Sequence, residues 1–163
     1  MRIIGIDPGL TKTGWGIIDI KNNNISFIAT GTIYSSAKDP ISQRLYHFYQ
    51  ELSRVIDDYQ PEIASIEETF ININPLSSLK LGHIRGAIIL TVAKKNITVF
   101  EYSATAVKKT IVGNGRADKN QIKMMVKILL PKAVPNTEDE ADALALAICH
   151  FHHSQQFIKK LDF

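Results

Sequence analysis

Three strand patterns follow one another without a helix between them at the start of the chain, and this order restricts the fold more than any other feature. Arg2–Asp7 is a short run of mainly β-branched residues that ends in Asp-Pro-Gly, which is typical of a strand followed by a turn. Thr13–Ile20 and Ile25–Tyr34 are rich in Ile, Thr, Phe and Trp, and Asn22–Asn24 separates them. The pair predicts a β-hairpin, so the sheet begins antiparallel.

Strands and helices alternate in the rest of the chain. The patterns are, in chain order, a helix containing Leu45–Tyr59, a strand at Ile63–Glu67, a helix at Leu76–Lys94, a strand at Ile97–Tyr102 and a helix at Gln121–Leu130. The last helix begins at a capping box, with Thr137 as N-cap and Glu140 three residues later. We expect a single α/β domain over residues 1–163, with a mixed five-stranded sheet flanked by helices on both faces.

Composition excludes several classes of protein. The chain has 163 residues, of which 45% are hydrophobic and 21% charged, so it can bury a core and is not disordered as a whole. Cys149 is the one cysteine, which excludes a disulfide scaffold. No apolar run approaches the ~18 residues that span a membrane, and the first ten residues lack the apolar stretch of a signal peptide. We therefore expect a cytoplasmic protein with no membrane partner.

Charge is unevenly distributed, although the net charge is only +3. Thr105–Lys132 contains seven basic residues and one acid, and the next ten residues contain four acids and no base. Two solvated helix faces would explain this pattern as well as the alternative does. The alternative is a surface that contacts phosphates, next to a site that holds cations.

Four carboxylates lie at the ends of apolar elements. Asp7 and Glu67 each end a strand, and Asp139 and Asp142 lie three residues apart at the start of the last helix. A turn residue or a helix-dipole partner would explain Asp7 or Asp139 taken alone. Glu67 ends a buried-type strand, where an unpaired carboxylate is costly. Strand ends converge at one edge of an α/β sheet, and converging carboxylates favour hard cations such as Mg²⁺.

The sequence resembles the RuvC family of Holliday-junction resolvases over nearly its whole length. The segments that carry this resemblance are Gly5-Ile6-Asp7-Pro8-Gly9 with Gly14, Ile66-Glu67-Glu68-Thr69-Phe70, Leu79-Lys80-Leu81-Gly82 with Arg85-Gly86, Phe100-Glu101-Tyr102, Val107–Gly115 and Asp139–Ala145. The first motif alone would be weak evidence for this family, but the whole set of motifs in this order is highly specific for it.

The resemblance implies a ribonuclease H-like fold and a homodimer that cuts four-way DNA junctions by paired, symmetric nicks in recombination and repair. It implies catalytic metal ligands at Asp7, Glu67, Asp139 and Asp142, which hold Mg²⁺, with two ions per site. Lys108 and Lys119 match the functional lysines of the family. Phe70, Lys108, Lys109, Arg116 and Lys119 are expected to contact DNA, and the products to carry 5′-phosphate and 3′-hydroxyl ends.

Partners follow from the same resemblance. We expect a branch-migration helicase of the RuvA–RuvB type as a partner of the resolvase. The homodimer is expected to form through Leu76–Lys94, in which Gly82 and Gly86 permit close approach of a second helix. The alternative is that both glycines pack against the chain's own sheet.

Three other functions are less consistent with the sequence. An actin-like ATPase shares the opening motif but needs two domains, and a shorter resolvase-like family does not account for the Asp139/Asp142 pair and the Lys108–Gly115 segment. A non-catalytic junction-binding module would be favoured by loss of a carboxylate, and none of the four is lost.

His150, His152 and His153 could suggest a metal cluster, but the interpretation that they are surface residues of a helix explains them better.

Overall fold

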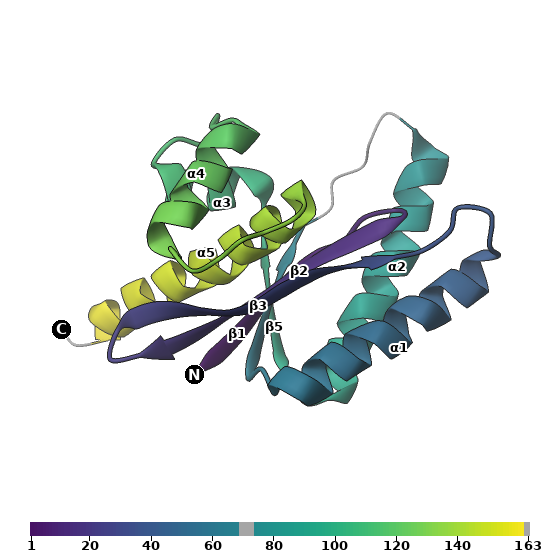
Figure 1. Cartoon of the computed structure of the whole chain (residues 1–163), viewed down its shortest axis with the longest axis horizontal. Coiled ribbons are helices and arrows are strands. Elements are labelled where there is room, and N and C mark those ends of the chain that lie inside the picture. The colour runs from purple at the N-terminus through teal and green to yellow at the C-terminus, as the bar shows by residue number, and fades with distance from the viewer. Residues whose placement is uncertain (69–73, 162–163) are drawn as a thin grey trace.

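The structure is a computed structural model that describes residues 1–68 and 74–161, with side chains up to residue 155. Its sheet has the strand order β3-β2-β1-β4-β5 (Figure 1). The strands in the described ranges are β1 (Arg2–Asp7), β2 (Lys12–Lys21), β3 (Asn24–Tyr34), β4 (Ile63–Glu67) and β5 (Thr98–Tyr102). The helices there are α1 (Ile41–Tyr59), α2 (Pro75–Lys94), α3 (Ala104–Val112), α4 (Lys119–Leu129) and α5 (Glu138–Leu161).

The sheet is mixed, as the strand patterns predicted. β1 pairs antiparallel with β2 and parallel with β4, and β4 pairs parallel with β5. Ile6 pairs with Ile66, so the two parallel strands end side by side. Asp7 and Glu67 therefore leave the same edge of the sheet, one residue beyond this pair.

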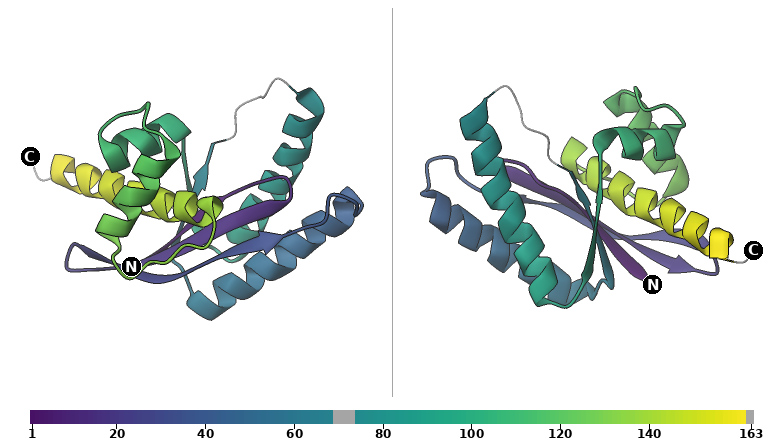
Figure 2. Two further views of the ribbon diagram at one scale, coloured as in Figure 1. Left: turned by 45° about the horizontal axis from the view of Figure 1, so that its top comes forward. Right: turned by 180° about the vertical axis from the view of Figure 1, so that it is seen from behind.

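Helices cover both faces of the sheet. α1 and α2 pack on one face, and α5 packs on the other with α3 and α4 against it (Figure 2). Neighbouring residues of β1 divide between the two cores, because side chains of a strand point alternately to opposite faces. Ile3 belongs to the core under α5, and Ile4 and Ile6 belong to the core under α1 and α2.

A row of glycines lets α5 approach the sheet closely. Gly5 of β1 pairs with Gly16 of β2, and Asp7 pairs with Gly14. A Cβ atom at Gly5 would lie 1.8 Å from the carbonyl oxygen of Ala143, and one at Gly14 would lie 2.1 Å from that of Asp139. Because these obstacles are backbone atoms of α5, any side chain at these positions would move the helix away from the sheet.

Two helix starts differ from the sequence analysis. α3 was not predicted, although Ser103 caps it by accepting a hydrogen bond from the Ala106 amide at 3.2 Å. α4 begins at Lys119 and not at Gln121, because Asp118 and Gln121 form a reciprocal capping box.

The capping box expected at α5 is only half formed. Thr137 Oγ1 accepts from the Glu140 amide at 3.2 Å, as predicted. The Glu140 carboxylate instead accepts from the Asn136 amide at 2.8 Å and from Thr32 Oγ1 at 2.9 Å. Glu140 therefore ties the start of α5 to β3, which is a tertiary contact that the local pattern could not show.

The expectation that no apolar segment is long enough to span a membrane was wrong for α2. Among the described residues this helix alone passes that test of length and composition, with a mean hydropathy of 1.2 over its most apolar 18 residues. Only 22% of that stretch is buried, and one such helix is weak evidence for a membrane span. Its apolar composition reflects two apolar faces, one packed in the core and one left exposed.

We predict that Gly5→Ala lowers the free energy of unfolding by about 3 kcal/mol, because the new methyl group would collide with the backbone of α5. Urea unfolding monitored by circular dichroism measures the change. Gly115→Ala is the matched control, since its methyl group would meet a Thr105 side-chain methyl group that can rotate away. The control should stay within about 1 kcal/mol of the parent chain. Equal losses in both variants would contradict the close contact.

Candidate active site

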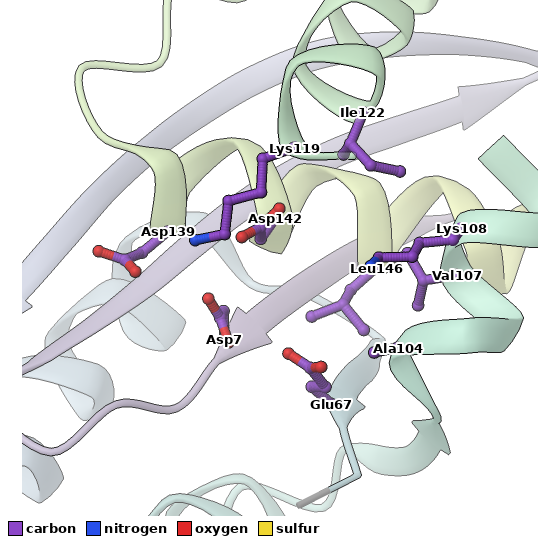
Figure 3. Close-up of a pocket in the computed structure, with 10 residues that line it drawn as sticks. All are labelled: Asp7, Glu67, Ala104, Val107, Lys108, Lys119, Ile122, Asp139, Asp142 and Leu146. Carbon is purple, nitrogen blue, oxygen red and sulfur yellow. The ribbon is translucent and has the colours of Figure 1, made fainter. Parts of the chain in front are cut away.

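One cavity brings together all six of the residues predicted to be catalytic. It has a volume of about 300 Å³ and lies where β1 and β4 end, between α5, α3 and the start of α4 (Figure 3). Its lining residues are Asp7, Glu67, Ala104, Val107, Lys108, Lys119, Ile122, Asp139, Asp142 and Leu146. The four carboxylates converge from three elements that are far apart in the sequence.

Strand alternation directs Asp7 and Glu67 into the cavity. Asp7 shares a face of β1 with Gly5, which lies against α5. On β4, buried Ser65 donates a hydrogen bond to the Leu146 carbonyl of α5 at 2.8 Å, so Glu67, two residues later, is on the same side. Glu68 is exposed and does not line the cavity. The geometry thus favours Glu67 over its neighbour, a choice that apolar periodicity alone left open.

Asp139 and Asp142 reach the cavity from the first turns of α5. Gly14 allows the backbone of Asp139 to lie directly on β2, so the start of the helix sits over the end of β1. The two carboxylates are three residues apart and therefore project from one side of the helix. Their position depends on the glycine row as much as on the acids themselves.

Burial and like charge raise the pKa of two of the carboxyl groups. Burial raises the pKa of Asp7 to about 8, with further contributions from Glu67, Asp142 and Asp139. Burial also raises the pKa of Asp142 to about 6, against the lowering effect of the Lys119 ammonium. Without a cation, the cluster thus retains protons that isolated carboxyl groups would release.

The donor set fits a hard divalent cation. Four carboxylates could supply oxygen ligands. Burial raises the pKa of Asp7 most, and the repulsion from its acidic neighbours that adds to it is what a bound cation would relieve. The cavity has room beside the carboxylates for a substrate phosphate group. Among the described residues that line it there is no His, Cys or Met, which disfavours softer metals.

Two lysines border the carboxylates, as predicted. Lys108 enters from α3, whereas Lys119 is the first residue of α4 and its amine points toward the acids (Figure 3). Lys119 Nζ lies 2.9 Å from the Glu138 carboxylate, and both side chains are largely exposed. An exposed ion pair of this kind is weak enough to exchange for a phosphate contact.

Sequence reasoning missed Lys12. Its Nζ atom lies 2.5 Å from Asp139 Oδ2, and this contact raises the pKa of the Lys12 ammonium. Lys12 lies two residues before Gly14 on β2 and hence on the face that meets Asp139. The hairpin register would have revealed it, because Gly14 pairs with Asp7 and β2 extends past the end of β1 at the site.

Two of the other predicted DNA contacts, Lys109 and Arg116, lie outside the cavity. Lys109 is exposed on α3 beside a separate cavity with His152 and His153, and Arg116 is exposed in the turn between α3 and α4. Phe70 lies outside the described residues.

The interpretation of the histidines as surface residues was wrong for His150. His150 is 3% exposed and its Nδ1 shares a hydrogen bond with the Tyr102 hydroxyl at 2.8 Å. The hydroxyl and ring contacts of Tyr102 and Phe100 bury it against β5. Within the described residues, no group of three or more His, Cys, Asp or Glu side chains is arranged as a preformed metal shell.

Comparisons with known proteins agree with this arrangement. The family model described as "Crossover junction endodeoxyribonuclease RuvC" matches residues 3–150, a range that includes all six residues of the cavity named above. The chain belongs to the RuvC family. The RuvC of Xanthobacter autotrophicus is 51% identical over 153 residues, which cover 94% of this chain and 90% of the relative. The RuvC of Afipia carboxidovorans is 52% identical over 155 residues, which cover 95% and 91%.

The fold of the RuvC family is also found among solved structures. A structure of "T. thermophilus RuvC in complex with Holliday junction substrate" matches with a TM-score of 0.89 and 27% sequence identity. The match covers 96% of each chain. The ribonuclease H-like α/β fold that the sequence resemblance implied is therefore confirmed.

We predict that stability falls with rising pH in the absence of divalent ions, because folded Asp7 holds a proton that the unfolded chain has released. With an ordinary pKa of 3.8 and a folded value of about 8, the loss extends from about pH 4 to pH 8. Asp7→Asn should add about 2 kcal/mol of stability at pH 8 and clearly less at pH 5. Thermal unfolding in EDTA measures the difference, and Asp58→Asn, on the exposed side of α1, should show no such pH-dependent gain. An unchanged pH slope in Asp7→Asn would refute the raised pKa.

Proposed function

We propose that this chain is a Mg²⁺-dependent endonuclease that resolves four-way DNA junctions by paired, symmetric nicks in homologous recombination and repair. The observation that carries the proposal is the convergence of four carboxylates and two lysines in one cavity of a RuvC-family chain. The solved complex of T. thermophilus RuvC with a Holliday junction substrate supports the choice of substrate. One RuvC-type domain over residues 1–163 would carry the activity.

Each carboxylate has a role in the proposed hydrolysis. Asp7, Glu67, Asp139 and Asp142 would hold two Mg²⁺ ions, which when bound supply an activated water and stabilise the leaving 3′ oxygen. Asp7 must give up its proton before it can act as a ligand, because burial and its acidic neighbours keep it protonated near neutral pH. We expect products with 5′-phosphate and 3′-hydroxyl ends.

The basic residues would act on the phosphate and on the DNA backbone. Lys108 and Lys119 border the cavity and would hold the scissile phosphate and offset its growing negative charge. Lys109 and Arg116 are exposed on the same basic segment and would contact backbone phosphates farther along the duplex arms. For Phe70 we retain the prediction that it stacks on DNA at the crossover.

A homodimer through α2 would supply the second cutting site. The exposed face of this helix carries Leu76, Leu79 and Leu90, which are 69%, 58% and 68% exposed. A Cβ atom at Gly82 or Gly86 would meet no atom of the described residues within 4 Å, so these glycines do not pack against the chain's own sheet. Both observations favour a second copy of α2 as the partner, and a two-fold dimer would match the near two-fold symmetry of a junction.

Two further expectations rest on the family resemblance. We propose a cytoplasmic location and a partnership with a branch-migration helicase of the RuvA–RuvB type. A non-catalytic junction-binding module remains the second candidate function. The four carboxylates that share one cavity disfavour it, because a module that only binds DNA has no use for converged acids beside phosphates.

The decisive experiment incubates a labelled four-way junction with the protein and Mg²⁺ and maps the ends of the products. We predict that Asp7→Asn reduces cleavage by more than about 100-fold. Junction affinity should change by less than about three-fold in a gel-shift assay, since phosphate contacts dominate affinity. Undiminished cleavage would remove Asp7 from the site, and cleavage absent from the parent chain would favour the non-catalytic module.

We predict that Lys108→Ala and Lys123→Ala separate catalysis from binding. At saturating protein, Lys108→Ala should lower the cleavage rate by about 100-fold, because Lys108 borders the carboxylates. Lys123 is exposed on α4, so Lys123→Ala should mainly weaken binding and reduce its salt dependence by about one unit. Single-turnover cleavage and salt titrations distinguish the two effects. Full cleavage by saturating Lys108→Ala would contradict the assignment.

A further inference from the structure

Arg85 of α2 reaches the backbone of Glu67. Its Nε atom donates a hydrogen bond to the Glu67 carbonyl oxygen at 3.3 Å, and its terminal nitrogen forms an ion pair with the Glu101 carboxylate of β5. The Arg85 side chain is 21% exposed, whereas that of Glu101 is 41% exposed. Arg85 and Glu101 belong to two motifs of the sequence for which the proposed hydrolysis provides no role.

Glu67 is the last residue of β4, and the sheet pairs with it on one side only. The β1–β4 pairing ends at Ile66, so Glu67 has no partner on β1. On its other side Glu67 is the last residue of β4 to pair with β5, opposite Tyr102. The Glu68 amide, which belongs to the same peptide group as the Glu67 carbonyl, donates a hydrogen bond to the Tyr102 carbonyl of β5 at 2.9 Å. Arg85 thus adds a second contact to this peptide group, at its carbonyl oxygen.

Arginine is well suited to this contact. The rigid, planar guanidinium group can donate in two directions at once, one arm to the Glu67 carbonyl and another to Glu101. The helix that carries it is anchored in the core by Ile84 and Ile88, which are 0% and 1% exposed. The Arg85 side chain is therefore fixed at its base by the packed helix and at its guanidinium group by the Glu101 carboxylate on β5.

We propose that Arg85 is a positioning residue for Glu67: oriented by Glu101, it fixes the backbone from which the Glu67 carboxylate enters the cavity. A carboxylate displaced by a fraction of an ångström would bind cations less well and hold them in a less productive place. The inference rests on the proposed role of Glu67 as a metal ligand. It also assigns α2 a second task, because the proposed dimer helix supports the catalytic strand.

Arg85→Lys is the informative substitution. A lysine keeps the positive charge and can pair with Glu101, but it lacks the second arm that reaches the Glu67 carbonyl. The single-turnover cleavage rate at saturating protein should fall about ten-fold, with junction affinity, dimer formation and melting temperature unchanged. Glu101→Gln should cause a smaller loss, and the double variant Arg85→Lys/Glu101→Gln should be about as slow as Arg85→Lys alone, because both residues act through one carbonyl group.

A second readout needs neither DNA nor cleavage. The Mg²⁺ concentration that gives half-maximal thermal stabilisation of the protein should rise about three-fold in Arg85→Lys. The matched control breaks another ion pair that holds α2, the one in which Lys95 Nζ lies 2.6 Å from Asp57 Oδ1 on α1. Lys95→Gln should leave the Mg²⁺ response and the cleavage rate at parental values.

The outcomes separate this inference from the proposed function. If Glu67→Gln cleaves normally, the assignment of Glu67 fails and Arg85 has nothing to position. If Glu67→Gln is inactive and Arg85→Lys cleaves and responds to Mg²⁺ like the parent, only the role of Arg85 is refuted. A loss of cleavage that Arg85→Lys shares with Lys95→Gln, together with lower melting temperatures, would make both pairs merely structural and overturn the proposal.

Discussion

Direct contact between α5 and the glycines of β1 and β2 is the constraint on which the rest of the structure depends. Gly5 of β1 pairs with Gly16 of the neighbouring strand β2, and Gly14 lies beneath Asp139. The backbone of the helix therefore rests on the backbone of the sheet, without the layer of side chains that normally separates them. This approach brings the first turns of α5 over the end of β1, where Asp7 is located. An alanine at one of these glycines would push α5 away from the sheet. The carboxylates would then move apart, although none of them had been substituted.

The contact between α5 and the sheet also brings the four carboxylates so close together that they repel one another. Four carboxylates share a cavity of about 300 Å³, and burial together with like charge raises the pKa of Asp7 to about 8. Lys12 offsets part of this charge through its ion pair with Asp139, and the Lys119 ammonium lowers the pKa of Asp142 against the effect of burial. A cluster of this kind is unfavourable for folding and favourable for binding cations, because a bound cation relieves the repulsion that the fold imposes.

The two faces of the sheet carry different features. The face under α5 carries the carboxylates, and the opposite face carries α1 and the long apolar helix α2 (Figure 2). Arg85 connects them, because it belongs to α2 yet contacts the main chain of Glu67 at the end of β4. The helix proposed to join two copies of the chain is thereby attached to the strand that carries Glu67, a proposed catalytic carboxylate. Arg85, which also pairs with Glu101 of β5, would then link the proposed interface to the proposed site.

Local patterns in the sequence were sufficient for the strands, for most helices and for naming Asp7, Asp139 and Asp142 as candidates, because alternation, helical spacing and turn residues act over a few positions. Helix α3 was missed, since its apolar face is short and its cap is a single serine. The choice of Glu67 over Glu68 came from the family motif, because both faces of β4 are apolar; the bond from Ser65 to Leu146 provides the physical reason. Lys12, the burial of His150 and the contact of Arg85 with Glu67 join residues that are far apart in the chain. The sequence alone thus determined which chemical groups the protein has and on which elements they lie. Only the tertiary structure decided which of them meet, because the distance between α5 and the sheet is set by packing across the whole domain.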